Sequence, residues 1–430
     1  MTAPPPSVAR ILILSLNFPP DLIGAARYSG ELAAWLVERG YEVEVITAPP
    51  YYPAWRLAHQ DHGWRYRRDV IAGASVTRCP LWVRPGLGGC GRLLHLASFA
   101  VSSGLPMVRR AWSWRPQVVF AVCPTLFALP AALIAARLSG ARTWLHVQDF
   151  EVDAAFALGL LATPQLRSLA LGAERALMAA CDMVSSLTPG MVGRLTTKGV
   201  PAHRTHLLPN WVDPAEIRCL TEPSSLRTEM GYGAGDILAL YAGNMGNKQG
   251  LETVINAARL TADLPHLHYL LVGDGSERTV LETAAQGLAT VRFAPLVPAG
   301  QLNALMNAAD IHVLPQRADA DGLMMPSKLS VMMASGKPVV AGASMGSEVA
   351  KAMMGCGVVV PPGSGAAFAE ALRQLAGESE RRSALGLEAR RRAITLWNRQ
   401  DVLSNFERRL RALAEQPQDV TAGSRGDHPS

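Results

Sequence analysis

Short apolar segments alternate with helical segments along most of the 430 residues. This alternation predicts parallel α/β sheets, because two consecutive parallel strands need a crossover connection, which is usually a helix. The strand-like segments are 10–16, 41–48, 74–79, 117–123, 141–148, 183–188 and 203–209, and then 236–243, 267–275, 290–296, 310–316, 337–343 and 357–363. The two series are separated by "LLPNWVDPAEI" (207–217), where prolines break the periodicity. We therefore predict two α/β domains in series.

The composition is that of a globular protein large enough for two cores. Hydrophobic residues make up 49% of the chain, and the six cysteines are scattered without a CxxC pair, so neither a zinc site nor a disulfide framework is predicted. The N-terminal "MTAPPPSVAR" lacks the pattern of a secretory signal, and no run of about 18 apolar residues predicts a membrane span. We expect a cytoplasmic protein without an integral membrane segment.

Positive charge is concentrated in the first half of the chain. Residues 1–210 contain 20 Lys and Arg against 12 Asp and Glu, and residues 54–115 contain ten arginines and five tryptophans. Arg and Trp around the apolar "RLLHLASFAVSSGLPMVRRAWSW" are typical of a surface that binds anionic lipid headgroups. A buried helix with a solvated rim explains the composition equally well, and no nucleic-acid-binding motif accompanies it. We expect peripheral binding at the inner face of the cell membrane and no nucleic-acid partner.

The loop after the first strand, "LNFPPDLIGAARYSG", lies where a dinucleotide-binding loop would lie. Its glycines, Gly24 and Gly30, are too far apart for G-x-G-x-x-G, and the second strand ends in Thr-Ala-Pro rather than in an acidic residue. A dinucleotide site is therefore not predicted. The loop leads into a helix whose first amides face the crevice, so Gly24 is a candidate for close approach of a phosphate or sugar. An ordinary turn glycine is the alternative.

A second glycine-rich turn follows the first strand of the second series, in "ALYAGNMGNKQGLETVINAARL" (239–260). Gly243, Gly246 and Gly250 lie next to Lys248 at the start of a helix, which offers backbone N–H groups, a helix dipole and a cation to one anion. Taken alone the signal is weak, because glycines are common in strand-to-helix turns for steric reasons. The next strand also ends in glycines, in "LLVGDG" (270–275).

Several motifs in series carry a family resemblance. They are "YSGELAAWLVERGYEVEVITAPPYYP", "RYRRD", "LHLASFA", "LSGARTWLHVQDFEVDAA", "LLPNW", "YAGNMGNKQGLE", "LVGDG" and "MPSKL…MASGKPVV". Together they resemble the retaining glycosyltransferases of the GT-B architecture, family 4, and most closely the fucosyltransferase-like transferases of colanic acid and exopolysaccharide biosynthesis. The resemblance covers nearly the whole chain up to about residue 412.

The resemblance implies two Rossmann-like domains that face a central cleft. Residues 1–208 would form the acceptor-binding domain and residues 209–395 the nucleotide-sugar-binding domain. Residues 396–414 would form a helix that crosses back to the first domain, and the composition of 415–430 predicts a disordered tail. The donor would be a nucleoside-diphosphate sugar and the acceptor a lipid-linked glycan, with helix dipoles and cations in place of a bound metal. No pair of His and Asp at a metal-ligand spacing indicates a bound metal, which agrees with a metal-independent enzyme.

The chain departs from the family at the residues that grip the donor. Typical members have an Arg directly after the glycine of the 243 turn and a Lys five residues later. Here these positions hold Asn244 and Gln249, with Lys248 one place earlier.

Typical members also have two glutamates eight residues apart, whose positions here hold Leu323 and Val331; the nearest polar groups are Asp321, Ser327 and Lys328. A lysine beside a diphosphate would offset the charge that develops on the leaving group, although a solvated lysine at a helix start is the alternative for Lys328. The predicted donor-binding residues are Gly24, Asn244, Gly246, Lys248, Gln249, Gly273, Gly275, Ser327 and Lys328.

The acceptor side is predicted in "LHVQDFEVD" (145–153), at the carboxyl end of a strand, where α/β sites lie. Of His146, Asp149, Glu151 and Asp153, we choose Asp149 as the residue that orients the acceptor hydroxyl or acts as the base, because it follows the strand end directly. Its alternative role is the N-cap of the following helix. His146, inside an apolar strand, is more typical of a packed, hydrogen-bonded core residue.

The predicted function is therefore transfer of fucose or another hexose from a nucleoside-diphosphate sugar to a lipid-linked oligosaccharide. Two alternatives stay open. A pseudo-transferase that scaffolds an assembly is suggested by the missing glutamates, and a sugar-nucleotide 2-epimerase would share the two-domain shape.

Overall fold

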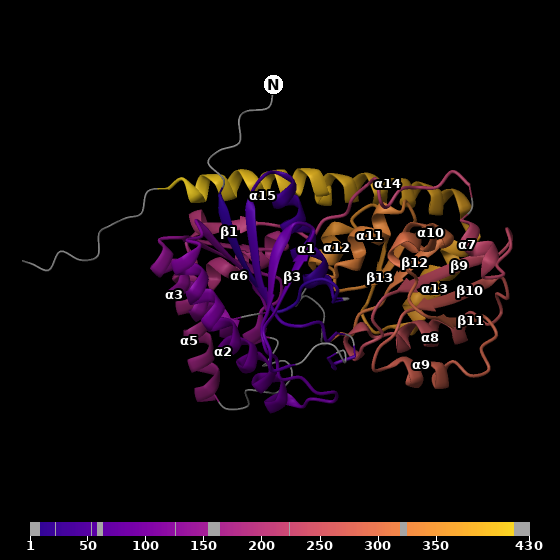
Figure 1. Cartoon of the computed structure of the whole chain (residues 1–430). Coiled ribbons are helices and arrows are strands. Elements are labelled where there is room, and N and C mark those ends of the chain that lie inside the picture. Colours follow the sequence, from indigo (N-terminus) through magenta and orange to yellow (C-terminus); the bar gives the residue numbers. More distant parts are fainter. Residues whose placement is uncertain are drawn as a thin grey trace, which may run out of the picture. The chain divides into compact units, whose positions relative to one another are not determined.

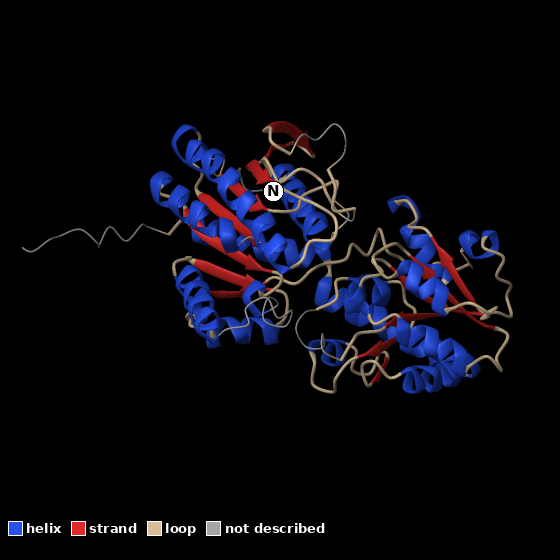
Figure 2. Ribbon diagram, turned by 90° about the horizontal axis from the view of Figure 1, so that it is seen from below, coloured by secondary structure: helices blue, strands red, loops and turns tan. Residues whose placement is uncertain are grey.

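The computed structural model describes residues 9–21, 23–52, 54–57, 63–124, 126–153, 164–222, 224–318 and 325–416. The chain divides into two compact units, Met1–Leu208 with Leu403–Ser430, and Pro209–Val402. In each unit, helices cover both faces of a sheet (Figures 1 and 2). The predicted tail at 415–430 lies outside the described residues from 417 onward.

The first unit contains an eight-stranded sheet in the order β3-β4-β2-β1-β5-β6-β7-β8. Its strands are β1 (Arg10–Ser15), β2 (Glu42–Thr47), β3 (Arg67–Ile71), β4 (Ala74–Arg78), β5 (Val118–Cys123), β6 (Arg142–Val147), β7 (Met183–Ser186) and β8 (Thr205–Leu207). Every pairing is parallel except β3 with β4, which are antiparallel and joined at Ala72 and Gly73, both with positive φ. The sequence did not predict β3, whose antiparallel pairing with β4 adds an edge to the predicted parallel sheet.

The helices of the first unit cover the sheet and include one from the C-terminal part of the chain. They are α1 (Gly24–Glu38), α2 (Gly89–Ser113), α3 (Leu129–Ser139), α5 (Pro164–Ala179), α6 (Pro189–Thr197) and α15 (Arg399–Ala414), with short 3₁₀ turns at η1 (Leu126–Ala128) and η2 (Ala202–Arg204). From α15, the buried Phe406 packs its ring against Phe120 and Trp144 at centroid distances of 5.4 and 4.9 Å. Glu407 accepts a hydrogen bond from the Tyr41 hydroxyl and pairs with Arg39.

The second unit contains a six-stranded, fully parallel sheet in the order β11-β10-β9-β12-β13-β14. Its strands are β9 (Ile237–Ala242), β10 (Leu267–Val272), β11 (Val291–Ala294), β12 (Ile311–Leu314), β13 (Val339–Gly342) and β14 (Val358–Val360). Its helices are α7 (Ser225–Glu229), α8 (Glu252–Leu260), α9 (Arg278–Ala284), α10 (Leu302–Ala308), α11 (Lys328–Ala334), α12 (Glu348–Ala352), α13 (Gly365–Gly377) and α14 (Ser379–Trp397), with 3₁₀ turns at η3 (Asn247–Gln249) and η4 (Ala299–Gln301). All six predicted strands are present.

Each sheet has one point where the strand order reverses. The chain runs outward from β1 in one direction and from β5 in the other, and likewise from β9 and from β12. Ligands of open α/β sheets bind outside the carboxyl ends of the strands at this point. The loops after β1, β5 and β6 in the first unit, and after β9, β10 and β12 in the second, are therefore the places to search for a site.

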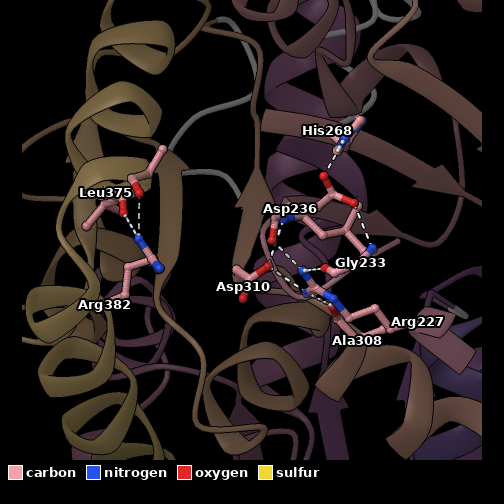
Figure 3. Close-up of polar contacts among 10 residues, drawn as sticks. Arg227, Gly233, Asp236, His268, Ala308, Asp310, Leu375 and Arg382 are labelled. Atoms are coloured by element: carbon pink, nitrogen blue, oxygen red, sulfur yellow. Dashed lines mark hydrogen bonds and ion pairs between the residues drawn. The ribbon is translucent and has the colours of Figure 1, made fainter. Parts of the chain in front are cut away.

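The opposite, amino edge of the second sheet is held by a polar network around Arg227 (Figure 3). The Arg227 guanidinium pairs with Asp310 at 2.6 Å and donates to the carbonyl oxygens of Ala308 and Gly233 at 3.0 and 3.2 Å. Asp310 and Asp236 lie just before β12 and β9, and Asp236 also contacts His268 at 3.2 Å. Because this network lies at the amino ends of the strands, its role is structural.

None of the helices in the described ranges is both long and apolar enough to span a membrane.

Candidate functional site

Two glycine turns lie against each other at the carboxyl ends of β9 and β10. The Gly243 amide donates to the Val272 carbonyl and the Met245 amide to the Asp274 carbonyl, both at 2.8 Å. A methyl group at Gly273 would lie 1.9 Å from the Gly243 carbonyl oxygen, so only glycine allows the two backbones to approach this closely. The result is a closely packed pair of glycine turns next to the point where the strand order reverses.

The side-chain amino group of Lys328 lies over these glycine turns. Lys328 is the first residue of α11, and a methyl group at Gly243 would lie 2.4 Å from its Cε and 2.6 Å from its Nζ. Its ammonium donates a hydrogen bond to the Tyr241 hydroxyl and lies 4.2 Å from the centre of the Tyr241 ring. Burial lowers the pKa of Lys328 to about 7. An amino group that titrates near neutral pH thus lies directly over the glycine turn.

The loop after β12 forms another wall of the same site. A methyl group at Gly250 would lie 3.0 Å from the backbone nitrogen of Arg317, so the loops after β9 and β12 touch. The Arg317 guanidinium donates to the Asn247 side chain at 2.8 Å. The neighbouring Gln316 is only 8% exposed, and its side-chain oxygen is buried without a hydrogen-bond partner.

The structure brings most of the predicted donor-binding residues together. Asn244, Gly246, Gly273, Gly275 and Lys328 belong to the cluster around the two turns. A methyl group at Gly275 would lie 2.8 Å from the Asn244 side-chain oxygen, and one at Gly246 would lie 2.9 Å from its nitrogen.

Three other predicted donor residues contribute less. Lys248 and Gln249 lie in the 3₁₀ turn η3, which separates the glycine turn from α8; the Lys248 side chain is exposed and makes no hydrogen bond or ion pair among the described residues. Ser327 caps α11 without a side-chain hydrogen bond to the helix amides. The first turn of α8 also carries Glu252, whose charge disfavours an anion there.

The structure describes only one of the two positions at which typical family members have glutamates. Val331 is buried in α11 as part of the hydrophobic core, as a valine should be. Leu323 and Asp321 lie outside the described residues.

On the first sheet, Asp149 follows the carboxyl end of β6 and is half-buried. Next to it, the Glu151 carboxyl group accepts a hydrogen bond from the Leu126 amide at 2.9 Å, while its other oxygen is buried without a partner. Burial, with a smaller contribution from the charge of Asp149, raises the pKa of Glu151 to about 7. Residues 151–153 are helical and the residues that follow lie outside the described ones, so the N-cap role of Asp149 stays open.

The other two residues considered in this segment are structural. Asp153 forms ion pairs with Arg194 at 3.1 Å and with Lys198 at 3.2 Å, which fix the segment against α6 and the turn that follows it. His146 is buried, its Nδ1 lies 2.9 Å from the Ser185 hydroxyl, and burial lowers its pKa to about 3. A neutral, hydrogen-bonded core histidine confirms the interpretation of His146 from the sequence.

Gly24 begins α1, and the loop before it is fixed by buried polar contacts. The Asp21 carboxylate accepts hydrogen bonds from the amides of Tyr51 and Tyr52 at 2.9 and 3.0 Å and from the Asn17 side chain at 2.9 Å. Burial nevertheless raises the pKa of Asp21. The loops after β1 and β2 are therefore held together at the carboxyl edge of the first sheet, where a ligand would bind.

Within the described ranges, no three side chains of His, Cys, Asp or Glu converge as ligands for a metal ion. Independence of metal stays a prediction.

The sequence matches two families of glycosyltransferase domains. Residues 24–211 match the glycosyl transferase 4-like domain, and residues 236–378 match the glycosyl transferases group 1 family. Over 375 residues, which are 85% of this chain and 91% of the relative, the chain is 39% identical to WcaI of Escherichia coli (strain K12), a glycosyl transferase provisionally assigned to colanic acid biosynthesis. The chain belongs to the glycosyltransferase family that includes WcaI. The family resemblance predicted from the motif series is confirmed.

Solved structures show that the glycosyltransferase has the GT-B fold. Sucrose-phosphate synthase from Thermosynechococcus elongatus matches with a TM-score of 0.74 at 17% identity, covering 94% of this chain and 99% of that chain. Anabaena HepE, solved in complex with UDP-glucose, matches with a TM-score of 0.66 at 15% identity and the same coverage of both chains. The predicted fold class is confirmed.

Sequence reasoning missed Tyr241 in this glycosyltransferase. It lies inside the apolar strand β9 and is only 1% exposed, so it reads as a core residue. The signal was its hydroxyl, because a buried tyrosine nearly always needs a hydrogen-bond partner.

Proposed function

We propose that this glycosyltransferase is a retaining enzyme that moves fucose or another hexose from a nucleoside-diphosphate sugar to a lipid-linked oligosaccharide during exopolysaccharide synthesis. The observation that carries the proposal is the Lys328 amino group over the paired turns of Gly243 and Gly273. Backbone amides and one cation at the reversal point of a parallel sheet are suited to a diphosphate.

The proposed chemistry needs a group that stabilises the departing diphosphate. Glycosyl transfer breaks the bond between C1 and the phosphate oxygen, so negative charge grows on the leaving group, and a fixed cation lowers the energy of that transition state. Lys328 would supply this charge in place of the family's Arg and Lys, without a metal ion. The relative HepE, solved with UDP-glucose, supports a nucleotide sugar as donor.

The acceptor would bind at the carboxyl edge of the first sheet. There, Asp149 would orient the acceptor hydroxyl, and the departing phosphate would take up its proton in a retaining reaction. Gly24, at the start of α1, would leave room for the donor phosphates or the sugar. The relation to WcaI supports an acceptor used in polysaccharide synthesis.

Membrane association of the first unit is proposed from the outer face of α2. Leu94, Val101, Leu105 and Trp112 recur at spacings of seven, four and seven residues, so they share one side of the helix, and each is more than half exposed. The buried side of α2 lies opposite, and no Asp or Glu occurs on the helix. An apolar stripe with arginines on the same helix would bind an anionic membrane surface.

A transfer assay tests the enzymatic proposal. The full chain is incubated with labelled nucleotide sugars and a lipid-diphosphate glycan extract, and transfer is expected with one donor class. Lys328→Ala should lower kcat/KM by about 100-fold or more, which is the size of the effect of losing one transition-state charge stabiliser. Lys351→Ala, at an exposed lysine of α12, is the matched control and should act like the parent.

Other outcomes of this assay contradict the proposal. Nucleotide binding without transfer or donor hydrolysis would indicate a pseudo-transferase. An epimerised sugar formed in the absence of acceptor would indicate a sugar-nucleotide epimerase.

Vesicle sedimentation tests the membrane proposal. The parent should bind vesicles that contain anionic phosphatidylglycerol more strongly than neutral ones, and the double variant Val101→Gln, Leu105→Gln should lose most of this binding. Leu387→Gln, at an exposed leucine of α14, is the control for loss of one apolar surface residue. Equal binding of all three proteins would refute the role of α2.

A further inference from the structure

We infer that Tyr241 positions the Lys328 amino group and that a nucleoside diphosphate binds this pair with uptake of one proton. The inference rests on the proposed function, because it concerns the same donor site. It adds a residue that the motifs did not indicate and a dependence of donor binding on pH.

The hydrogen-bond directions follow from the chemistry of the three groups. The Asn244 carbonyl oxygen can only accept, and it lies 2.5 Å from the Tyr241 hydroxyl, so that hydroxyl donates its proton to Asn244. The Tyr241 oxygen is left to accept from Lys328. Tyr241 therefore ties the lysine amine to the turn after β9, and the ring beneath the amine stabilises its charged form.

No described residue serves as an anionic partner of Lys328. Burial is the cause of its lowered pKa. On its own helix, the neighbouring polar groups are the uncharged Ser327 and Ser330. From β9 and the turn after it, the facing groups are Tyr241 and Asn244, which are also uncharged.

In the part of the surrounding turns that the structure describes, the charged side chains named below are engaged elsewhere or exposed. Asp274 accepts from the Gly275 amide at 2.8 Å, and Arg278 donates to the Gly273 carbonyl at 2.6 Å while it pairs with Glu282. Arg317 is bonded to Asn247, and Lys248 is exposed. A half-buried amine with no counter-ion among the described residues, next to a glycine turn, is half of an anion site, and a diphosphate supplies the other half.

The proton balance follows from this arrangement. With a pKa near 7 in the free protein, most of the Lys328 side chains are neutral amines at pH 8. A bound diphosphate favours the ammonium form, so the amine takes a proton from solvent as the nucleotide binds. Donor affinity should then be constant below about pH 7 and fall by up to tenfold for each pH unit above it.

Titration calorimetry with UDP and GDP as probes measures the proton directly. At pH 8, in two buffers of different ionisation enthalpy, the parent should take up close to one proton per nucleotide. The phosphate groups themselves titrate near about pH 6 and add little there. The dissociation constant should weaken between pH 7 and pH 9.

Two variants test whether the proton taken up on nucleotide binding goes to the Lys328 amino group that Tyr241 positions. Lys328→Arg keeps a charge that does not titrate, so binding should lose its pH dependence and its proton uptake. Tyr241→Phe keeps the buried ring and removes only the oxygen that accepts from the amine. Its pH midpoint should fall by about one unit, with binding about tenfold weaker at pH 8 and restored near pH 6. A merely structural tyrosine would change the melting temperature and leave this midpoint in place.

The possible outcomes distinguish a failure of this inference from a failure of the proposed function. Failure of both nucleotides to bind at every pH would overturn the proposed donor site itself. Binding with one affinity from pH 7 to pH 9 and no proton uptake would overturn the inference and leave the donor site intact. Uptake that persists in Lys328→Arg, or an unmoved midpoint in Tyr241→Phe, would overturn the roles assigned to those residues.

Discussion

Burial shifts the pKa values of two side chains of this glycosyltransferase toward neutral pH. One of these side chains lies at the carboxyl edge of each sheet. Lys328 donates to a tyrosine and has no counter-ion among the described residues, while the Glu151 carboxyl group has one bonded and one unpaired oxygen. Burial disfavours the charged form in both cases, so the lysine pKa falls and the glutamate pKa rises. Perturbed groups of this kind gather at functional sites, which supports the choice of these two edges.

The raised pKa of Glu151 predicts that the stability of the fold depends on pH. Its pKa is about 7 in the folded state against 4.5 ordinarily, so between these pH values only the folded chain holds the proton, and stability falls as pH rises through this window. Glu151→Gln removes this penalty. Its melting temperature relative to the parent should therefore be higher at pH 8 than at pH 5, by a few degrees.

The control for this prediction is Glu38→Gln, at an exposed glutamate on α1 of the same unit. Its melting temperature should follow the parent at both pH values. If the Glu151→Gln difference were the same at pH 5 and pH 8, Glu151 would titrate as an ordinary surface carboxylate.

At the scale of elements, most strands could be predicted because their signal is local. A short, almost wholly apolar run such as "ILALYA" in β9 is buried on both faces, and the sequence shows this directly. β3 was missed because "RRDVI" is charged and lies at the edge of the sheet, where it pairs with β4. Its turn also depends on a positive φ at Ala72, a residue that gives no turn signal.

The element-scale prediction concerns Arg227, which joins the segments before β9 and β12. Arg227→Ala would leave Asp310 partly buried without its cation and would remove several bonds to backbone carbonyls. Unfolding of the second unit should become easier by about 2–3 kcal/mol, measured by urea denaturation. Arg218→Ala, at an exposed arginine of the same unit, should change stability little. A similar loss in both variants would mean that the network contributes nothing specific.

At the scale of the whole chain, the candidate site could be predicted only as separate pieces. The glycine turns and "PSKL" are local motifs, but the contact of Tyr241 with Lys328 joins residues 87 positions apart. No periodicity reports such a contact, because it depends on how β9 and α11 pack. For the same reason the sequence alone could not choose between Lys248 and Lys328 as the lysine that contacts the donor diphosphate. In the structure Lys248 is exposed, whereas Lys328 lies against the glycine turn.

The first unit also depends on the far end of the chain. Phe406 of α15 is fully buried and packs against Phe120 and Trp144, so its side chain completes a core made by residues more than 250 positions earlier. Phe406→Ala should cost about 3–5 kcal/mol, the usual effect of deleting a buried aromatic ring. We expect the first unit to unfold at lower urea concentration and to be cleaved faster by protease, with fragments that start within Met1–Leu208.

Leu387→Ala, at an exposed position of α14, is the matched control and should unfold like the parent. The decisive observation is which unit loses protection. If Phe406→Ala instead exposed cleavage sites within Pro209–Val402 and left the first unit resistant, α15 would belong energetically to the second unit. Protection of both units at the parent's level would show that α15 adds little to either core, despite the burial of its aromatic ring.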